Sequence, residues 1–187
     1  FFERLDRSYF IDNESVKRHA HVDTALPIGY EQTISQPSLV LEMTCLLAPQ
    51  KEHKILEVGT GSGYQTALLA EFAGEVFTIE RIPELAESAK RKLHELGYRN
   101  IHFKLGDGSD GWPEHAPYDR IMVTAAAAKM PEELVKQLKA GGKMVIPLGA
   151  KGWQELCVIS KNESGEVRSE SVGEVTFVEM KGKYGWT

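Results

Sequence analysis

After residue 53 the chain alternates short apolar runs with longer amphipathic runs. This pattern is typical of repeated strand–helix units around a mostly parallel sheet. Pro83 and Gly97 are residue types expected at the start and the end of a helix, and Gly141-Gly142 is expected to end another. The pattern predicts strands at residues 54–58, 75–80, 101–105, 118–124 and 143–148, and helices at residues 63–73, 83–96 and 131–139.

The pattern changes near the end of the chain. Residues 154–160 and 172–180 read as strands with no helix between them, and the polar turn 161–165 joins them. Two strands joined in this way form an antiparallel hairpin. We therefore expect an α/β, doubly wound, Rossmann-like fold whose mostly parallel sheet carries a C-terminal antiparallel hairpin.

Residues 1–52 do not follow this alternation. They contain a short helical start, an irregular stretch at residues 22–37 and a predicted helix at about residues 38–47. No repeat or linker separates them from the rest of the chain. We expect one domain over residues 1–187, in which residues 1–52 cap the carboxyl edge of the sheet and residues 53–187 form the cofactor-binding sheet and the hairpin.

Composition excludes several classes of partner. A net charge of −5, without a block of Lys and Arg, leaves no positive surface for a nucleic acid. The apolar stretches fall short of the roughly 18 to 20 residues that span a bilayer. Cys45 and Cys157 lie in apolar runs, which favours two buried thiols in a reducing cytoplasm and excludes a four-ligand zinc site. We expect a cytoplasmic monomer with no metal, nucleic-acid or membrane partner.

A glycine-rich motif follows the first predicted strand. Gly59, Gly61 and Gly63 alternate between that strand and the next helix, where the backbone must turn sharply and a ligand must approach closely. Glu80 ends the second strand, where a carboxylate can accept both ribose hydroxyls of an adenosine. Together these residues predict a site for an adenosine-containing cofactor.

The spacing of the motif favours one such cofactor. A nicotinamide-dinucleotide fingerprint has its third glycine at the position of Tyr64. Glu57, Glu80 and Asp107 would place negative charge around the crevice, which suits a cationic sulfonium better than a pyrophosphate. We therefore expect S-adenosylmethionine, with S-adenosylhomocysteine as product. Asp107, between Gly106 and Gly108, could accept the adenine amino group or could equally be a turn-forming residue.

Several segments together resemble the protein-L-isoaspartate O-methyltransferases. Residues 26–37, with the sequence LPIGYEQTISQP, are similar to the characteristic loop of that family, and residues 57–63, 106–108 followed by Trp112-Pro113, and 177–178 also fall where the family has equivalents. The resemblance implies transfer of a methyl group from S-adenosylmethionine to the side-chain carboxylate of isoaspartyl residues in damaged proteins and peptides. In that family the ester then closes to a succinimide, which begins repair.

The resemblance also implies roles for individual residues. Ser35 would be the catalytic serine, and Ile28, Ser35 and the terminal strand around Val178 would bind the substrate. Glu31 and Glu179 depart from the family, which usually has a small residue and a proline there. The residues implied for the cofactor by motif and resemblance are Gln32, Thr33, Ile34, Glu57, Gly59, Thr60, Gly61, Ser62, Glu80, Arg81, Gly106, Asp107 and Gly108.

The expected chemistry needs orientation and no strong base. A carboxylate with a reference pKa of roughly 4 is already ionised at neutral pH, so Ser35 would orient an oxygen by a hydrogen bond. Ser35 could instead cap the helix that begins near Pro37. Three other functions stay open: a methyltransferase for another small-molecule or nucleic-acid acceptor, a nicotinamide oxidoreductase, and a binding module without catalysis.

Overall fold

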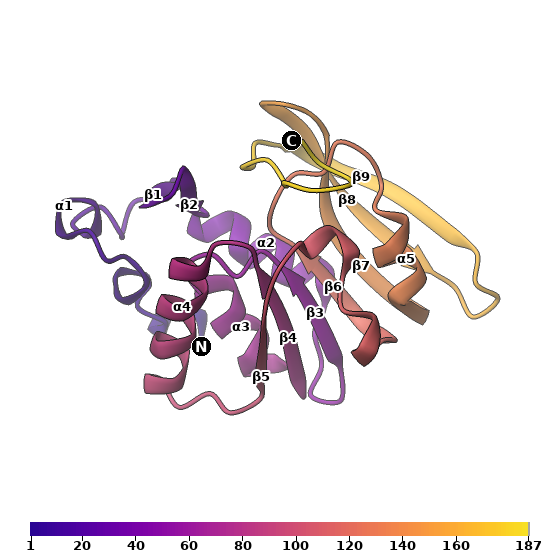
Figure 1. The fold of residues 1–187 in the computed structure, drawn as a ribbon, viewed down its shortest axis with the longest axis horizontal. Coiled ribbons are helices and arrows are strands. Elements are labelled where there is room, and N and C mark those ends of the chain that lie inside the picture. Colours follow the sequence, from indigo (N-terminus) through magenta and orange to yellow (C-terminus); the bar gives the residue numbers. More distant parts are fainter. Residues whose placement is uncertain (187) are drawn as a thin grey trace.

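The computed structural model describes residues 1–186 and contains a seven-stranded sheet with the order β5-β4-β3-β6-β7-β8-β9 (Figure 1). The first five of these strands are parallel, whereas β8 and β9 are antiparallel and form the C-terminal hairpin. The predicted doubly wound, Rossmann-like fold is therefore confirmed. The strands are β3 (Lys54–Val58), β4 (Glu75–Glu80), β5 (Ile101–Leu105), β6 (Tyr118–Val123), β7 (Leu138–Ala150), β8 (Trp153–Lys161) and β9 (Val167–Val175).

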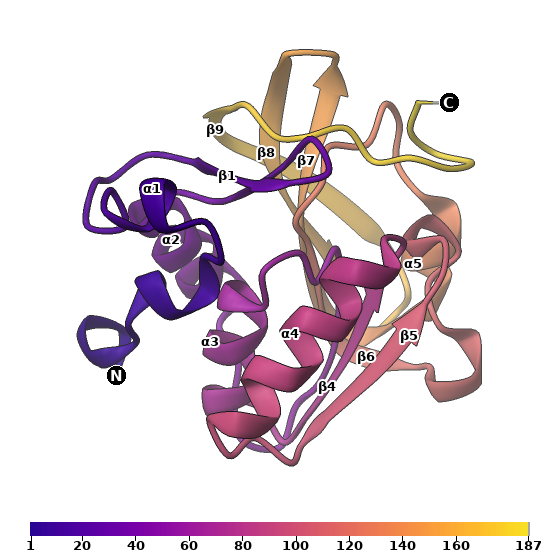
Figure 2. The same ribbon diagram turned by 60° about the vertical axis from the view of Figure 1, so that its left-hand side comes forward.

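Helices cover both faces of the sheet, with α3 and α4 on one side and α5 on the other (Figures 1 and 2). In β3, Ile55 packs into the core that includes α2, α3 and α4, while Leu56 packs into the core that includes α5. A strand buried on both faces reads as a nearly continuous apolar run, which is why the sequence pattern located it. The helices are α2 (Pro37–Leu47), α3 (Tyr64–Phe72), α4 (Pro83–Glu95) and α5 (Glu132–Gln137), with short 3-10 turns η3 (Gly108–Asp110) and η4 (Pro113–His115).

The boundary between α5 and β7 differs from the prediction. The helix was expected to reach residue 139, but it ends at Gln137 and β7 begins at Leu138. Leu138 is buried and pairs with Tyr118, and the register then shifts before Lys143 pairs with Arg120. Pairing with the neighbouring strand outweighs the helical pattern there, so the glycines at 141 and 142 lie within a strand instead of ending a helix.

The last strand also differs from the prediction at residues 172–180. It begins at Val167, directly after the turn, and ends at Val175. The chain then leaves the hairpin, because the Phe177 N–H donates to Gln154 Oε1 at 2.8 Å and the Phe177 side chain is buried. Residues 178–180 instead pair with Ala126, which follows β6. The end of the chain therefore returns to the carboxyl edge of the parallel strands.

The N-terminal segment forms a hairpin that the sequence pattern did not predict. Strands β1 (Leu26–Gly29) and β2 (Gln32–Ile34) pair with each other and, within residues 1–186, with no other strand, and Tyr30 and Glu31 at the tip have positive φ angles of 54° and 58°. Helix α2 packs on one face of the sheet against α3, β6 and β7, whereas the end of the hairpin, the residues just after it and Val40 of α2 reach the cavity at the carboxyl edge (Figure 2). The segment that was predicted to cap the carboxyl edge of the sheet therefore lies partly on a face of the sheet, through α2, and partly at that edge, through the hairpin.

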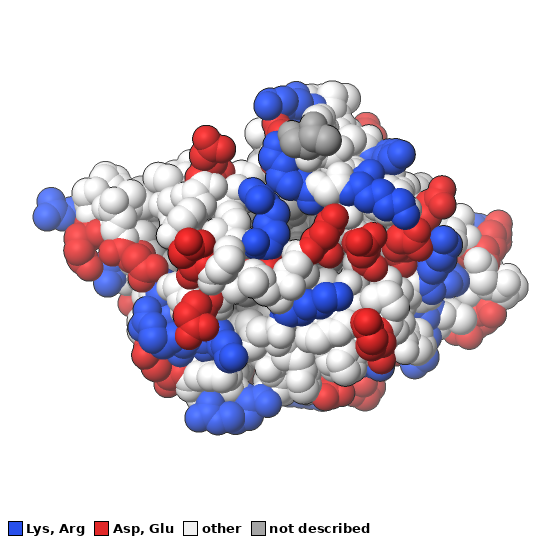
Figure 3. Space-filling model, in the orientation of Figure 1, with Lys and Arg blue, Asp and Glu red and all other residues white. Residues whose placement is uncertain are grey.

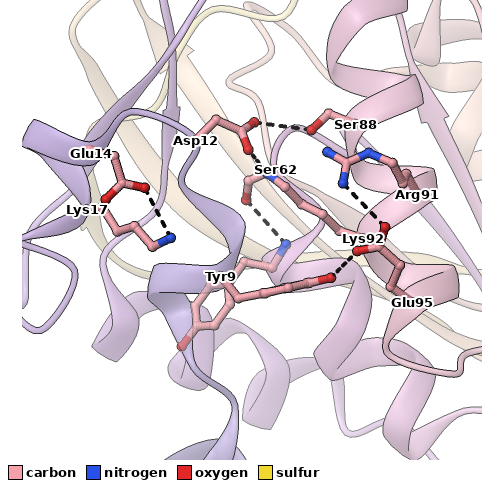
Figure 4. Close-up of polar contacts among 10 residues, drawn as sticks. Tyr9, Asp12, Glu14, Lys17, Ser62, Ser88, Arg91, Lys92 and Glu95 are labelled. Atoms are coloured by element: carbon pink, nitrogen blue, oxygen red, sulfur yellow. Dashed lines mark hydrogen bonds and ion pairs between the residues drawn. The ribbon is translucent and has the colours of Figure 1, made fainter.

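Ion pairs and hydrogen bonds attach the start of the chain, which contains η1 (Phe2–Arg4), η2 (Arg7–Phe10) and α1 (Glu14–Lys17), to helix α4 (Figure 4). Lys92 Nζ lies 2.9 Å from Asp12 Oδ1, and the Tyr9 hydroxyl donates to Glu95 Oε2 at 2.5 Å. The Lys92 side chain is only 5% exposed, so Asp12 compensates a nearly buried charge.

The two cysteines have different environments. Cys157 is buried, as expected, but Cys45 is exposed on α2, so the prediction of two buried thiols is wrong for Cys45. An apolar run in a helix spans its inner and outer faces alike, and Cys45 points outward while Val40, Met43 and Leu47 point inward. Among residues 1–186 no helix is long and apolar enough to cross a membrane.

Candidate active site

An open cavity lies at the carboxyl ends of β3, β4 and β6. Strands β4 and β5 extend from β3 in one direction, whereas β6 and β7 extend in the other, so the strand order reverses between β3 and β6. Ligands of open α/β sheets bind at such a reversal. Most of the lining comes from three parts of the chain: residues 32–35 in and just after β2, the ends of the parallel strands with the turns that follow them, and residues 178–181. Val40 of α2 and the first two residues of α3 complete it.

The glycine-rich turn after β3 forms one wall of the cavity. Gly59, Gly61 and Gly63 have φ angles of +96°, +52° and +88°, a region that favours glycine. A Cβ at Gly59 would lie 2.3 Å from Thr124 Oγ1, whose hydroxyl donates to the Gly59 carbonyl at 2.6 Å. Position 59 therefore requires glycine both for its backbone angles and for the space around it.

Glu80, at the end of β4, organises this turn and also lines the cavity. Its Oε2 accepts from the Gly61 N–H at 2.9 Å, and its Oε1 accepts from the N–H groups of Arg81 and Ile82 at 2.8 and 2.9 Å. A carboxylate offers about four lone-pair sites. Three of these sites are occupied by the backbone N–H groups, so one site on Oε2 is left for a ligand hydroxyl. The sequence prediction that Glu80 accepts both ribose hydroxyls would need two free sites.

Glu57 does not line the cavity, although the sequence placed it in the cofactor site. Its side chain is fully buried beneath the glycine-rich turn, where Oε2 accepts from the hydroxyls of Thr66 and Thr78, each at 2.6 Å. Burial raises the pKa of Glu57 to about 8. The carboxyl is therefore predominantly protonated at neutral pH and supports the turn from below.

The electrostatic reasoning for a sulfonium is therefore wrong in part. Glu57 adds no negative charge to the crevice at neutral pH, and the cavity-lining carboxylates are Glu80 and Glu179. Glu179 lies 2.7 Å from Lys151 and 3.1 Å from Lys181, and the hydrogen bond from Lys151 is the main cause that lowers its pKa. The cavity presents both signs of charge.

Asp107 does not line the cavity, although Gly106 and Gly108 do. Its Oδ1 accepts from the Ser109 N–H at 2.8 Å, and a Cβ at Gly182 would lie 2.3 Å from its Oδ2. Here the side chain caps a short 3-10 turn and contacts the end of the chain. The sequence left a turn-forming role open, and this geometry matches that role.

Ser35 lines the cavity between β2 and α2. Its hydroxyl makes no hydrogen bond within the described residues, and it does not cap α2. Asp23 provides the cap instead: its Oδ1 accepts from the Ser38 N–H at 2.9 Å, and this bond is the main cause that lowers the Asp23 pKa. The capping alternative for Ser35 is therefore not realised.

The structure brings most of the predicted site residues together. Of the residues named from the sequence, Ile28, Glu57 and Asp107 lie outside the cavity lining, although Ile28 Cδ1 would be 3.9 Å from a Cβ at Gly61. Within residues 1–186 no group of three His, Cys, Asp or Glu side chains could hold a metal ion. The predicted residues that line the cavity are Gln32, Thr33, Ile34, Ser35, Gly59, Thr60, Gly61, Ser62, Glu80, Arg81, Gly106, Gly108 and Val178.

Sequence reasoning missed other lining residues. Thr124 and Ala125 follow β6 at the reversal of strand order, and the rule that ligands bind there could have identified them. Tyr64 and Gln65 begin α3 and were read only as helix. Met180 and Lys181 reach the cavity because the chain leaves the hairpin after Val175, which the strand pattern does not indicate.

Comparison with known proteins gives a consistent result. A family model described as protein-L-isoaspartate(D-aspartate) O-methyltransferase matches residues 1–185. A protein-L-isoaspartate O-methyltransferase of Dictyoglomus turgidum is 53% identical over 183 residues, which cover 98% of this chain and 82% of the relative.

Solved structures with a similar fold include two of the same description. A protein-L-isoaspartate O-methyltransferase superposes with a TM-score of 0.86 and 29% identity, over 97% of this chain and 60% of that one. A putative protein-L-isoaspartate O-methyltransferase from Plasmodium falciparum, in complex with S-adenosyl-L-homocysteine, has a TM-score of 0.75 and 24% identity over 96% of each chain.

Proposed function

Because the chain belongs to the protein-L-isoaspartate O-methyltransferase family, we propose that its cavity holds S-adenosylmethionine and an isoaspartyl residue side by side, with Ser35 orienting the carboxylate. The protein transfers a methyl group from S-adenosylmethionine to the free carboxylate of isoaspartyl residues in proteins and peptides. The observation that carries the role of Ser35 is its position in the cavity lining, with a hydroxyl that makes no hydrogen bond within residues 1–186.

The residues present fit the cofactor. The turn at Gly59 and Gly61 allows close approach, and a side chain at position 59 would fill that space. Glu80 keeps one acceptor site on Oε2 for a ribose hydroxyl, while Gly106 and Gly108 line the cavity beside it. S-adenosylmethionine supplies the transferable methyl group on a sulfonium.

Ser35 has a limited but specific task in this reaction. The isoaspartyl carboxylate is an ionised nucleophile at neutral pH, so no residue needs to remove a proton. What the protein must provide is alignment, and a hydrogen bond from the Ser35 hydroxyl to one carboxylate oxygen leaves the other oxygen for the methyl group. Ile34 and Val40, both buried, line the same wall and keep water away.

The substitution Ser35→Ala tests this role. A hydrogen bond to a charged group contributes about 1.5–3 kcal/mol, so kcat should fall roughly 10- to 150-fold while the affinity for S-adenosylhomocysteine stays the same. Methyl transfer should be measured on two peptides that differ only in isoaspartate against aspartate, together with calorimetric titration of S-adenosylhomocysteine.

Ser38→Ala is the matched control, because Ser38 is exposed on the first turn of α2 and does not line the cavity. It should retain wild-type kcat. Wild-type kcat in Ser35→Ala would refute the orienting role of Ser35. Equal transfer to both peptides would refute selectivity for isoaspartate.

A second substitution, Glu80→Gln, tests the cofactor site. An amide has one acceptor oxygen, so at least one of the N–H groups of Gly61, Arg81 and Ile82 would lose its partner along with the ribose hydroxyl. We expect the dissociation constant for S-adenosylhomocysteine to rise about 10- to 100-fold, or about 1.4–2.8 kcal/mol.

The control for this titration is Glu84→Gln in the exposed first turn of α4, which should bind like the wild type. An unchanged dissociation constant in Glu80→Gln would contradict the placement of the ribose.

The protein is proposed to act in the cytoplasm as a monomer and a single domain.

Nucleic acid and membranes are not among the proposed partners. Acidic and basic side chains are interspersed over the face in Figure 3, which supports a peptide acceptor over a polyanion. The two core clusters share the strands of one sheet, which supports a single domain. An alternative acceptor would appear as methyl transfer to RNA, DNA or a small molecule in place of the isoaspartyl peptide.

A further inference from the structure

Arg7, in η2, is a nearly buried charge whose nearest acidic influence, Asp23, acts on it without forming an ion pair. Arg7 is 5% exposed, and among residues 1–186 no carboxylate forms an ion pair with it. Burial lowers the pKa of Arg7, yet a guanidinium stays protonated in proteins. A charge removed from water needs strong hydrogen bonds in compensation.

Five backbone carbonyls provide that compensation. Nη1 donates to Ala20 and Val22, each at 3.1 Å, and Nη2 donates to Thr24 at 2.7 Å, Ser35 at 3.0 Å and Ile34 at 3.3 Å. These acceptors belong to two separate stretches, residues 20–24 before β1 and residues 34–35 at the end of β2. One side chain therefore joins both ends of the N-terminal hairpin.

The stretch that Arg7 holds carries the proposed catalytic group. Ile34 and Ser35 line the cavity, whereas Arg7 does not. Among the described residues, β2 pairs with β1 and with no strand of the main sheet, so the hydrogen bonds of that sheet do not hold this stretch. Within residues 1–186, the side-chain hydrogen bonds that hold the backbone next to Ser35 are the two from Arg7 and, three residues further on, the bond from the Ser38 N–H to Asp23, beside the ladder that pairs Ile34 with Leu26.

We propose that Arg7 is a positioning residue for methyl transfer, which holds the backbone of Ile34 and Ser35 from behind and so fixes the Ser35 hydroxyl at the cavity. This inference rests on the proposed role of Ser35. The planar, forked guanidinium serves five carbonyls at once, and a lysine in its place has three donors on one atom. Arg7→Lys keeps the charge but cannot hold both stretches.

The same N-terminal segment offers a matched control. Asp12 and Lys92 form the contact that attaches this segment to α4 (Figure 4), and neither residue touches residues 34–35 or lines the cavity. Asp12→Asn leaves Lys92 without its charged partner and should loosen the segment as a whole. It therefore separates a general loss of stability from a specific loss of positioning.

The experiment compares Arg7→Lys and Asp12→Asn by Tm, by titration of S-adenosylhomocysteine and by kcat on the isoaspartyl peptide. We expect both variants to melt at a lower temperature. Only Arg7→Lys should lose kcat, about 10- to 100-fold, with cofactor affinity changed less than threefold. Arg7→Gln, which introduces no lysine charge, should behave in the same way and replaces Arg7→Lys if that variant does not fold.

The double variant Arg7→Lys, Ser35→Ala tests whether Arg7 acts through the serine. If it does, kcat falls no further than in Ser35→Ala alone, because coupled residues are not additive. Wild-type kcat in Arg7→Lys, equal kcat losses in Arg7→Lys and Asp12→Asn, or additive losses in the double variant would each overturn the proposal for Arg7 alone. Wild-type kcat in Ser35→Ala would overturn the role of Ser35 and, with it, that of Arg7.

Discussion

Gly59→Ala should abolish tight cofactor binding and lower the free energy of unfolding by about 2–5 kcal/mol. The φ angle of +96° costs an alanine about 1–2 kcal/mol, and overpacking adds about 1–3 kcal/mol. The new methyl group would lie 2.3 Å from Thr124 Oγ1. Thr124 cannot turn away without losing its hydrogen bonds to the carbonyls of Val58 and Gly59.

Gly97→Ala provides a control at a glycine with a similar φ angle. Gly97 has φ +91° and no atom within 4 Å of an added Cβ, so it carries the conformational cost without the clash. Denaturant unfolding of both variants should give a loss of about 1–2 kcal/mol for Gly97→Ala, a larger loss for Gly59→Ala, and weakened S-adenosylhomocysteine binding for Gly59→Ala only. Equal losses of stability in the two variants would show that the surroundings of Gly59 are not tight.

Glu57→Gln should change how stability depends on pH. In the folded protein the pKa of Glu57 is about 8, above its ordinary value of 4.5. Below pH 4.5 the carboxyl is protonated in both states and costs nothing. Between pH 4.5 and about 8 the unfolded state releases the proton while the folded state keeps it. The wild type should therefore lose up to about 1.4 kcal/mol of stability for each pH unit in that window.

Denaturant unfolding at pH 5, 6, 7 and 8 measures this slope. The amide oxygen that the substitution introduces can still accept from Thr66 and Thr78, so Glu57→Gln should fold, and its stability should lack the fall with pH that Glu57 causes in the wild type. Glu52→Gln, at an exposed position, should retain the wild-type slope. Parallel slopes for the wild type and Glu57→Gln would mean that Glu57 ionises in the folded protein as it does in water.

The elements that could be predicted from the sequence are those whose residues both determine the local backbone and line the site. The apolar run of β3 followed by Gly59, Gly61 and Gly63 has few alternative structures, because each glycine adopts a positive φ angle. Glu80 was found because its distance from the motif places it at the adjacent strand end. Ser35 came from the family resemblance, since a serine two residues before a proline also reads as a helix cap.

The missed features depend on contacts between distant segments. The β1–β2 hairpin has only three residues in its second strand, too few for a clear alternation. Glu57 was assigned to the cofactor site because it directly precedes the glycine-rich motif. Its carboxyl instead accepts hydrogen bonds from Thr66 and Thr78, two residues outside the motif, and these contacts could not be read from the motif alone. The path of residues 177–181 is set by Gln154 and Ala126, far away in the chain.

Because residues 178–181 line the cavity, the parts of the site are synthesised at different times. During synthesis the glycine-rich turn and Ser35 leave the ribosome long before this stretch, and domains fold as synthesis proceeds. A nascent chain that ends after β9 already has the parallel strands and the cofactor turn, but it lacks the wall formed by Val178, Glu179, Met180 and Lys181. Translation of these late residues therefore completes the pocket, and a chain interrupted before them carries an open one.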